Sequence, residues 1–378
     1  MLTEKIRVAV LLGGASNEKE TSLDSGRNVF YKLAPHKYDA IALFVSSNLE
    51  LYKLTQSQLV RNSTAEIVEL LQESQKIKWS DLPTIADFVF NALHGGEGEN
   101  GSVQGALEML GMPYNGSSVL ASALCMNKYK TNQLLAINGF DVPKHVYFSP
   151  SPVSYDGRPL KDLCKEITAQ LSWPMIVKPH DDGCSVMVQK ANTQEELIAA
   201  IEKVLEQKNA VLIEECITGM ELTVGVIGND VARALPPSQA ISAHGILSIE
   251  EKFLPGAGEN QTPAPLPKET LRFVQDVMEQ VYTTLQCRGY VRIDCFYQSA
   301  DISPTGKERV VILEINTLPG LTPATCLFHQ AAEIGLKPMD FIDLIITLGF
   351  EEHNPTFKHK DLFQYASLLQ KNYQELNH

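Results

Sequence analysis

The sequence predicts an α/β protein that begins with a parallel β-sheet. An apolar run at Ile6–Leu12 reads as a buried strand, and a helical pattern follows it and ends near Leu33. Further strand patterns cover Ala40–Val45 and Phe88–Leu93. This strand–helix–strand order is typical of a Rossmann-like sheet. The G-x-G-x-x-G pattern of dinucleotide-binding proteins is absent from it.

A glycine-rich loop follows the third of these strands. His94–Gly101 holds four glycines in eight residues, at the carboxyl end of a strand, where open α/β sheets bind ligands. A flexible surface loop has the same composition, so both interpretations stay open. Residues 46–80 are poorly patterned, with one helical stretch at Ala65–Ser74, and are expected to form an insertion. A helix is expected at Ser102–Leu110, and Gly111–Ser118 closes this part of the chain.

The middle of the chain combines short strands with an amphipathic helix. A helix begins at Met126–Lys128, residues 142–148 cross over, and a surface loop rich in Ser and Pro covers 149–160. The strand Met175–Pro179 carries Lys178, and the turn His180–Ser185 leads into a strand at 186–189. Small residues in such a turn let backbone N–H groups approach an anion, so the pattern fits a phosphate cover.

The remaining elements alternate between strands and helices. Residues 235–262 are mostly irregular, and loops of this length inside compact domains are usually functional or mobile. The tail after Glu351 is polar and is expected to form at most a marginal terminal helix. The other expected elements are helices at Thr193–Lys208 and Lys268–Leu285, strands at Val211–Ile217, Glu221–Ile227, Tyr290–Phe296 and Arg309–Asn316, and two short helices within Gln330–Gly349.

The last two predicted strands carry polar groups in otherwise apolar runs. Arg292 and Asp294 are two residues apart, as are Glu314 and Asn316, so each pair points to one face of its strand. Two carboxylates and an amide are hard oxygen donors, the ligands that Mg²⁺ takes when it bridges phosphates. The alternative is a solvated hairpin edge with an ion pair, but isolated buried charges are costly and Ile, Leu and Val surround these.

Composition limits the classes of partner. The 378 residues are 44% hydrophobic and 20% charged, as in ordinary globular proteins, and can form two or three domains. A net charge of −13 argues against nucleic acid or an anionic membrane as the main partner. Seven scattered cysteines without a CxxC pair favour reduced thiols. No apolar run is long enough to span a bilayer and no signal peptide is evident, so a cytoplasmic location is expected.

Six motifs in order give the sequence a family resemblance. They are Leu-Gly-Gly-x-Ser-x-Glu-x-Glu-x-Ser from Leu12, His-Gly-x-x-Gly-Glu-x-Gly-x-x-Gln-Gly from His94, Pro-Tyr-x-Gly-Ser from Pro113, Val-Lys-Pro from Val177, Arg-Ile-Asp from Arg292, and Glu-Ile-Asn-Thr-x-Pro-Gly from Glu314. Each is weak alone. Together, between about Arg7 and about Phe350, they resemble the D-alanine–D-alanine ligase family of ATP-grasp carboxylate–amine ligases.

The resemblance implies a fold and a reaction. The expected fold is a Rossmann-like N-terminal domain followed by a two-part ATP-grasp fold. The expected limits are 1–124 for the substrate-binding domain, 125–222 and 223–350 for the ATP-grasp subdomains, and 351–378 for a polar extension. ATP would phosphorylate the carboxylate of one D-alanine, and the amine of a second would displace phosphate, giving D-alanyl-D-alanine for peptidoglycan precursors. Family members are commonly homodimers, but the sequence carries no interface signature.

The resemblance also assigns residues. Asp294, Glu314 and Asn316 would bind two Mg²⁺ or Mn²⁺ ions. The implied ATP-binding residues are Lys128, Lys178 and Lys252 for the phosphates, Glu214, Glu215 and Ile217 for the adenine, and Glu221 for the ribose. Arg292 and the Gly320 N–H would stabilise the oxyanion. Glu18 would hold the first ammonium, His94 would line that subsite, and Thr325 would meet the second carboxylate.

Two positions depart from the family pattern. Where the family has a Ser and a Tyr that hydrogen-bond with the equivalent of Glu18, this chain has Cys184, followed by Ser185, and Phe253; we count all three among the catalytic positions. Cys is a weak donor and Phe has none, although one lost neutral hydrogen bond costs only about 1 kcal/mol. A Phe at that Tyr position resembles ligases that accept D-lactate.

Three hypotheses therefore stand. The preferred one is a D-alanine–D-alanine ligase that tolerates its altered lid. The second is a related ligase with another acceptor, such as D-lactate or a different amino acid. The third is a nucleotide-binding homologue without catalysis, against which the intact Lys, Arg, Asp, Glu and Asn set argues.

Replacing Phe253 by Tyr is expected to shift acceptor preference toward an amine, because the hydroxyl restores the family's hydrogen bond. The ratio of dipeptide to depsipeptide, read by mass spectrometry with D-alanine and D-lactate in competition, checks this. An unchanged ratio would mean that position 253 does not decide the acceptor.

Overall fold

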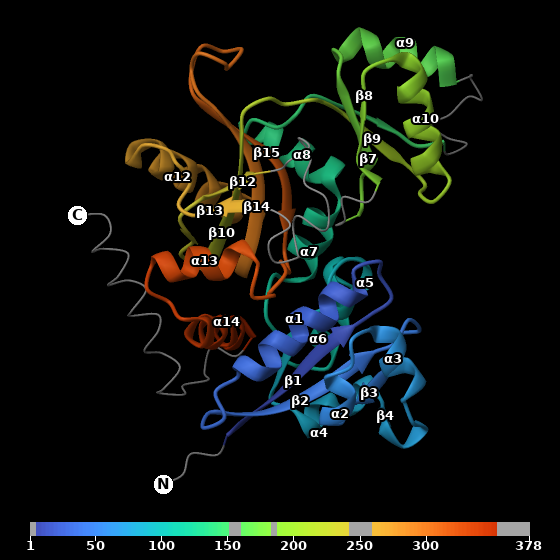
Figure 1. The fold of residues 1–378 in the computed structure, drawn as a ribbon, viewed down its shortest axis with the longest axis vertical. Coiled ribbons are helices and arrows are strands. Elements are labelled where there is room, and N and C mark those ends of the chain that lie inside the picture. Colours follow the sequence, from blue (N-terminus) through green and yellow to red (C-terminus); the bar gives the residue numbers. More distant parts are fainter. Residues whose placement is uncertain (1–4, 151–159, 183–186, 242–258, 354–378) are drawn as a thin grey trace.

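The computed structural model describes residues 5–150, 160–182, 187–241 and 259–353 (Figure 1). Its strands form three sheets, and each sheet lies in a different region of the molecule. None of the described helices is long and apolar enough to cross a membrane. The domain limits expected from the sequence stay a prediction.

The N-terminal sheet has the strand order β4-β3-β2-β1-β5. Its strands are β1 (Ile6–Gly13), β2 (Tyr38–Val45), β3 (Leu51–Lys53), β4 (Lys76–Ile77) and β5 (Phe88–Asn91). Its helices are α1 (Lys19–Lys32), α2 (Gln56–Leu59), α3 (Thr64–Glu69), α4 (Leu82–Ile85), α5 (Gly96–Glu99) and α6 (Ser102–Met109). β1 pairs in parallel with β2 and β5, which confirms the predicted parallel sheet.

Residues 46–80 are not a separate insertion. β3 pairs antiparallel with β2, and β4 pairs antiparallel with β3, so this segment adds two strands to one side of the sheet. The expected helix at Ala65–Ser74 is the shorter α3. The Ser63 hydroxyl accepts from the Glu66 N–H and fixes where that helix begins.

The middle sheet is fully antiparallel, with the order β6-β9-β7-β8. Its strands are β6 (His145–Phe148), β7 (Met175–Pro179), β8 (Gln189–Ala191) and β9 (Val211–Glu215). The helices α9 (Leu160–Gln170) and α10 (Gln194–Leu205) pack against this sheet, whereas α7 (Val119–Met126) and α8 (Lys128–Ile137) share the core of the third sheet. The helix expected to begin at residues 126–128 is α8, and Asn127 caps it by accepting the Lys130 N–H. The helix α7 before it was not predicted.

The third sheet has the order β13-β12-β10-β14-β15, and β11 pairs with β10. Its elements are β10 (Met220–Gly228), β11 (Arg233–Ala234), β12 (Ser238–Ile241), β13 (Glu259–Gln261), β14 (Gly289–Gln298), β15 (Arg309–Asn316), α12 (Lys268–Thr284), α13 (Cys326–Glu333) and α14 (Pro338–His353). The stretch expected to be irregular, 235–262, thus holds strands at both described ends. The last helix, α14, is longer than expected.

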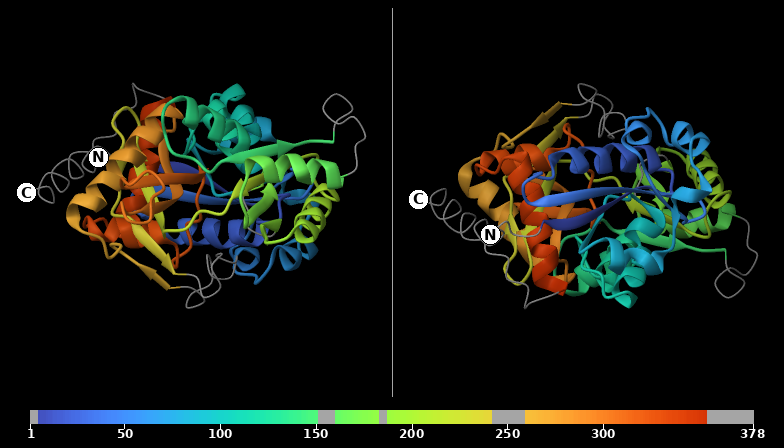
Figure 2. Two further views of the ribbon diagram at one scale, coloured as in Figure 1. Left: turned by 90° about the horizontal axis from the view of Figure 1, so that it is seen from above. Right: turned by 90° about the horizontal axis from the view of Figure 1, so that it is seen from below.

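The C-terminal helix α14 returns to the first sheet. Figure 2 shows α14 (dark red) beside α1 and the N-terminal strands (blue), and one hydrophobic cluster joins Val8 and Phe88 to Leu344 and Phe350. At Gly349 a Cβ atom would lie 2.6 Å from the Tyr114 carbonyl oxygen and 2.7 Å from the Phe88 ring. Only glycine permits this close approach.

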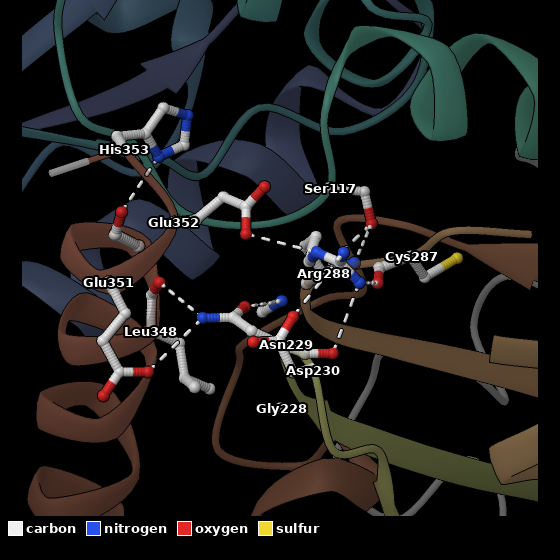
Figure 3. Close-up of polar contacts among 12 residues, drawn as sticks. Ser117, Gly228, Asn229, Asp230, Cys287, Arg288, Leu348, Glu351, Glu352 and His353 are labelled. Atoms are coloured by element: carbon white, nitrogen blue, oxygen red, sulfur yellow. Dashed lines mark hydrogen bonds and ion pairs between the residues drawn. The ribbon is translucent and has the colours of Figure 1, made fainter. Parts of the chain in front are cut away.

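A polar junction anchors the start of β14 (Figure 3). The Asn229 side chain accepts from the Gly289 N–H at 3.1 Å and donates to the Leu348 carbonyl of α14 at 3.0 Å. Arg288 pairs with Glu352 of α14 at 3.2 Å. The N–H of Arg288 donates to the Ser117 hydroxyl. The first residues of β14 are thus tied both to α14 and to the segment that ends the N-terminal sheet.

Replacing Asn229 by Ala is expected to destabilise the protein by about 1–3 kcal/mol, because two backbone groups lose their partner. Urea unfolding measures the change. Asn138, which is exposed and donates only to its own helix, supplies the control variant Asn138→Ala. Equal stability of the two variants would show that the junction contributes nothing measurable.

Candidate active site

The predicted charged cluster forms on β14 and β15. The register places Asp294 opposite Glu314 and Arg292 opposite Asn316. The Arg292 guanidinium donates to both Asp294 oxygens at 2.9 Å, so these two side chains share a face as predicted. Asp294 also accepts from the Thr223 hydroxyl at 2.6 Å. Burial would lower the pKa of Arg292, but Asp294 and Glu314 raise it, so the guanidinium stays charged.

Lys128 joins this cluster from the first turn of α8. Its ammonium lies 3.1 Å from a Glu314 oxygen and donates to the Asp182 carbonyl at 2.6 Å. Burial would lower the pKa of Lys128, but Glu314 outweighs it and the pKa is raised. The Asn316 amide nitrogen lies 3.5 Å from Asp294. The three expected metal ligands therefore lie together, within reach of two fixed cations.

A second cation–carboxylate pair lies on the middle sheet. Lys178 on β7 and Glu214 on β9 are both buried, with 2.7 Å between nitrogen and oxygen. The second Glu214 oxygen accepts from the Asn132 amide at 3.1 Å. Glu215 accepts the Lys144 N–H at 2.9 Å, and Ile217 follows, half-buried, in the link to β10. Four of the residues expected around ATP, Lys178, Glu214, Glu215 and Ile217, thus lie on the middle sheet or directly after it.

A pocket opens beside Arg292. Residues from β10, β14 and the segment before α13 line it together with Asn260 of β13. The lining includes the predicted site residues Glu221, Arg292, Asp294, Gly320 and Thr325. The Thr325 hydroxyl donates to the Thr322 carbonyl at 2.8 Å. Cys326, the first residue of α13, also lines the pocket.

Glu18 precedes α1 and faces the same region from the N-terminal sheet. Its Oε1 atom is buried and has no hydrogen-bond partner among the described residues. Burial, with help from Glu99, Asp182 and Glu314, raises the pKa of Glu18 to about 7. Gly95 has φ of 63°, and a Cβ there would lie 3.0 Å from Oε1, so glycine is needed beside this carboxyl group. A buried, unpartnered carboxyl group suits a cationic ligand.

His94 is buried and both of its ring nitrogens bind protein groups. Nδ1 lies 2.9 Å from the Leu318 carbonyl oxygen and Nε2 lies 2.8 Å from the Ser25 hydroxyl. Burial lowers the pKa of His94 to about 4, so the ring is neutral. Neither nitrogen is left for a substrate.

Two family models match the sequence. The model described as D-ala D-ala ligase N-terminus matches residues 7–117, and the one described as D-ala D-ala ligase C-terminus matches residues 134–347. The chain belongs to the D-alanine–D-alanine ligase family. A protein named D-alanine--D-alanine ligase from Desulforudis audaxviator is 34% identical over 346 residues, covering 91% of this chain and 99% of that protein. A protein of the same name from Syntrophobacter fumaroxidans is 34% identical over 355 residues, covering 93% and 100%.

Solved structures of this family share the fold. The VanG D-Ala:D-Ser ligase from Enterococcus faecalis superposes with a TM-score of 0.77 at 29% identity, covering 92% of this chain and all of that one. The D-alanine–D-alanine ligase from Coxiella burnetii gives a TM-score of 0.77 at 25% identity, covering 98% and 100%. The Bacillus anthracis enzyme complexed with ATP gives 0.69 at 26% identity, covering 93% and 100%. The predicted class, a Rossmann-like domain followed by an ATP-grasp fold, is confirmed.

Four predicted positions lie outside the described residues. They are Cys184, Ser185, Lys252 and Phe253. Within the described part, no group of three or more His, Cys, Asp or Glu side chains lies close enough to hold a metal ion. The set expected for the D-alanine–D-alanine ligase family contains two carboxylates and an amide, so it does not depend on such a group.

Sequence reasoning missed several polar partners in this site. Glu99 accepts the Gly95 and Leu318 N–H groups at 3.1 and 3.2 Å, and it stands in the glycine-rich motif that carries the family resemblance. Thr223 follows Glu221 by two residues on β10, so the strand pattern could have found it. Ser25 and Asn132 lie within helices and gave no local signal.

Replacing His94 by Gln is expected to flatten the pH dependence of stability. The folded pKa of about 4 lies below the ordinary value of 6.5, so the unfolded chain binds the proton first and stability is lost as pH falls from 6.5 to 4. The full loss attributable to this group is roughly 3 kcal/mol. Urea unfolding of both proteins between pH 7.5 and 4 measures it; parallel curves would contradict a buried neutral imidazole.

Proposed function

We propose that this protein joins two D-alanine molecules with ATP, giving D-alanyl-D-alanine, ADP and phosphate for peptidoglycan precursors, in the cytoplasm. The observation that carries the proposal is the cluster of Arg292, Asp294, Glu314 and Lys128 beside a pocket, with the buried Glu18 near enough to Arg292 and Glu314 to interact with their charges. Relatives of this chain that carry the name D-alanine--D-alanine ligase match it over their full length.

ATP would lie between the middle and third sheets. Lys128 and Lys178, with Lys252 from outside the described residues, would neutralise its phosphates, because phosphoryl transfer depends on positioning and charge neutralisation. Glu214, Glu215 and Ile217 would frame the adenine and Glu221 the ribose. The Bacillus anthracis structure complexed with ATP supports a nucleotide in this fold.

Two Mg²⁺ or Mn²⁺ ions would be held by Asp294, Glu314 and Asn316. The fit rests on the donor chemistry and the register: hard oxygens from facing positions of two paired strands. When bound, such ions neutralise charge that develops on the transferred phosphoryl group. The side chains of Lys128 and Lys178 would neutralise the remaining phosphate charge.

The joining step needs a positive environment for an oxyanion. The amine of the second D-alanine attacks the carbonyl carbon of the acyl phosphate, and the resulting oxyanion collapses as the bond to phosphate breaks. Arg292 and the Gly320 N–H would stabilise that oxyanion. Glu18 would hold the first ammonium, and Thr325 would meet the second carboxylate.

A second candidate is a ligase with another acceptor. The VanG relative is titled a D-Ala:D-Ser ligase, and in this chain Cys326 lines the pocket beside Arg292. Cys184 and Phe253 favour the same alternative, with D-lactate or another amino acid as acceptor. A homodimer is also expected from the family.

The test is phosphate release from ATP with Mg²⁺, with product masses recorded for D-alanine alone and with D-lactate or D-serine added. D-alanyl-D-alanine as the main product supports the proposal. A depsipeptide or mixed dipeptide as the main product would replace it by the second candidate, and ATP hydrolysis that no amino acid stimulates would overturn both.

Replacing Glu314 by Gln is expected to lower turnover by more than about 100-fold, because a carboxylate that neutralises and positions charge at the transferred phosphoryl group is lost. The circular dichroism spectrum should be unchanged. Exposed Glu308, just before β15, provides the control Glu308→Gln with unchanged turnover. Full activity of the Glu314 variant would refute the metal assignment.

A further inference from the structure

The turn from Leu318 to Leu321 contains Gly320. Side chains from helix α1 and from the glycine-rich loop His94–Gly101 bind this turn. Leu318 donates its N–H to Glu99 at 3.2 Å, and its carbonyl oxygen lies 2.9 Å from Nδ1 of His94. Leu321 donates its N–H to the Ser25 hydroxyl at 3.0 Å, and its carbonyl accepts from the Asn28 amide at 2.6 Å. All four backbone groups that flank Pro319 and Gly320 are therefore bound from across the sequence.

The direction of every hydrogen bond in one arm of this network can be assigned. The Leu318 carbonyl can only accept, so Nδ1 of His94 carries the proton. The neutral ring then accepts at Nε2 from the Ser25 hydroxyl, whose oxygen accepts the Leu321 N–H. The arm runs from Leu321 through Ser25 and His94 back to Leu318, and each group is used once. Rotating the ring or moving the turn breaks two bonds together.

We propose that Ser25, His94, Glu99 and Asn28 are positioning residues that set the Gly320 N–H against the first substrate. The inference rests on the proposed function, which gives that N–H to the oxyanion. The same short segment reaches both parts: His94 and Glu99 bind the turn, while Gly95, which also donates to Glu99, packs against Glu18. The carboxyl group that holds the substrate's ammonium and the donor that meets its oxyanion are thus joined through a few buried hydrogen bonds.

These hydrogen bonds are not needed merely to hold the N-terminal sheet against the C-terminal segment. The hydrophobic cluster around α14 already joins the N-terminal sheet to the C-terminal segment. The network is instead concentrated on the four residues that carry the oxyanion donor, and its members Ser25, His94 and Glu99 are nearly inaccessible to solvent. Misplacing a catalytic group by about 1 Å can cost about 100-fold in rate.

The test compares Ser25→Ala with Ser22→Ala. Both serines are fully buried on α1, but Ser22 accepts only from the Gly13 N–H within its own sheet. Ser25→Ala is expected to lower kcat for dipeptide formation at least about 10-fold, with KM for ATP changed less than about 2-fold. Amide hydrogen exchange in the peptide containing 318–321 should accelerate. Ser22→Ala should change neither kcat nor that exchange.

Asn28→Asp is a second variant for the case that Ser25→Ala fails to fold. It keeps the shape and the acceptor for Lys32 but removes the donor to Leu321, at a half-buried site. Faster exchange at the turn with lower kcat again supports the proposal. Unchanged kcat, or a matching loss in Ser22→Ala, overturns it.

A failure of the proposed function can be distinguished from a failure of this positioning proposal. The wild-type protein would then form no dipeptide, and exchange at the turn would still decide whether the network holds it. Exchange in Ser25→Ala equal to wild type overturns the positioning proposal whatever the reaction.

Discussion

Buried charge that requires a counter-charge governs the arrangement of this site. An unpaired ion away from water costs several kcal/mol, and three carboxylates around the site each face a cation. Asp294 forms an ion pair with Arg292, Glu314 with Lys128, and Glu214 with Lys178. The Lys128–Glu314 pair joins the first turn of α8 to the third sheet, and the Lys178–Glu214 pair joins β7 to β9. The region between these ion pairs therefore suits a ligand that carries several negative charges and needs cations at fixed positions.

The N-terminal sheet completes the site from the opposite side. The helix α14 packs against it through apolar contacts, and the polar junction around Asn229 ties that helix to the start of β14. With the strand bearing Arg292 so anchored, the turn around Gly320 meets the glycine-rich loop, whose Gly95 packs against Glu18. We therefore expect stability and catalysis to depend on the same contacts between the beginning and the end of the chain.

The sequence predicted most of what has a local pattern. Apolar runs and alternation placed β1, β2, β5, β14 and β15, and the two-residue spacing put Arg292 and Asp294 on one face. Short strands such as β3 and β4 were missed because two or three residues carry no period, and pairing with a neighbouring strand stabilises them.

The partners of the site residues were harder to predict. Ser25 and His94 meet the turn near Leu318 only because the chain folds back across nearly its whole length. No local pattern encodes such a contact. His94 was expected to line the substrate, but in the structure its ring nitrogens are bonded within the protein. A motif can therefore identify a residue of the site without predicting which groups that residue contacts.

We infer that this site activates a carboxylate by phosphoryl transfer and then resolves the acyl phosphate beside Arg292 and Gly320. The most direct measurement uses D-alanine labelled with ¹⁸O in its carboxylate. The released phosphate should carry one ¹⁸O atom, because the carboxylate oxygen that attacks ATP stays bonded to phosphorus when the amine displaces phosphate. Unlabelled phosphate accompanied by dipeptide would contradict the claim.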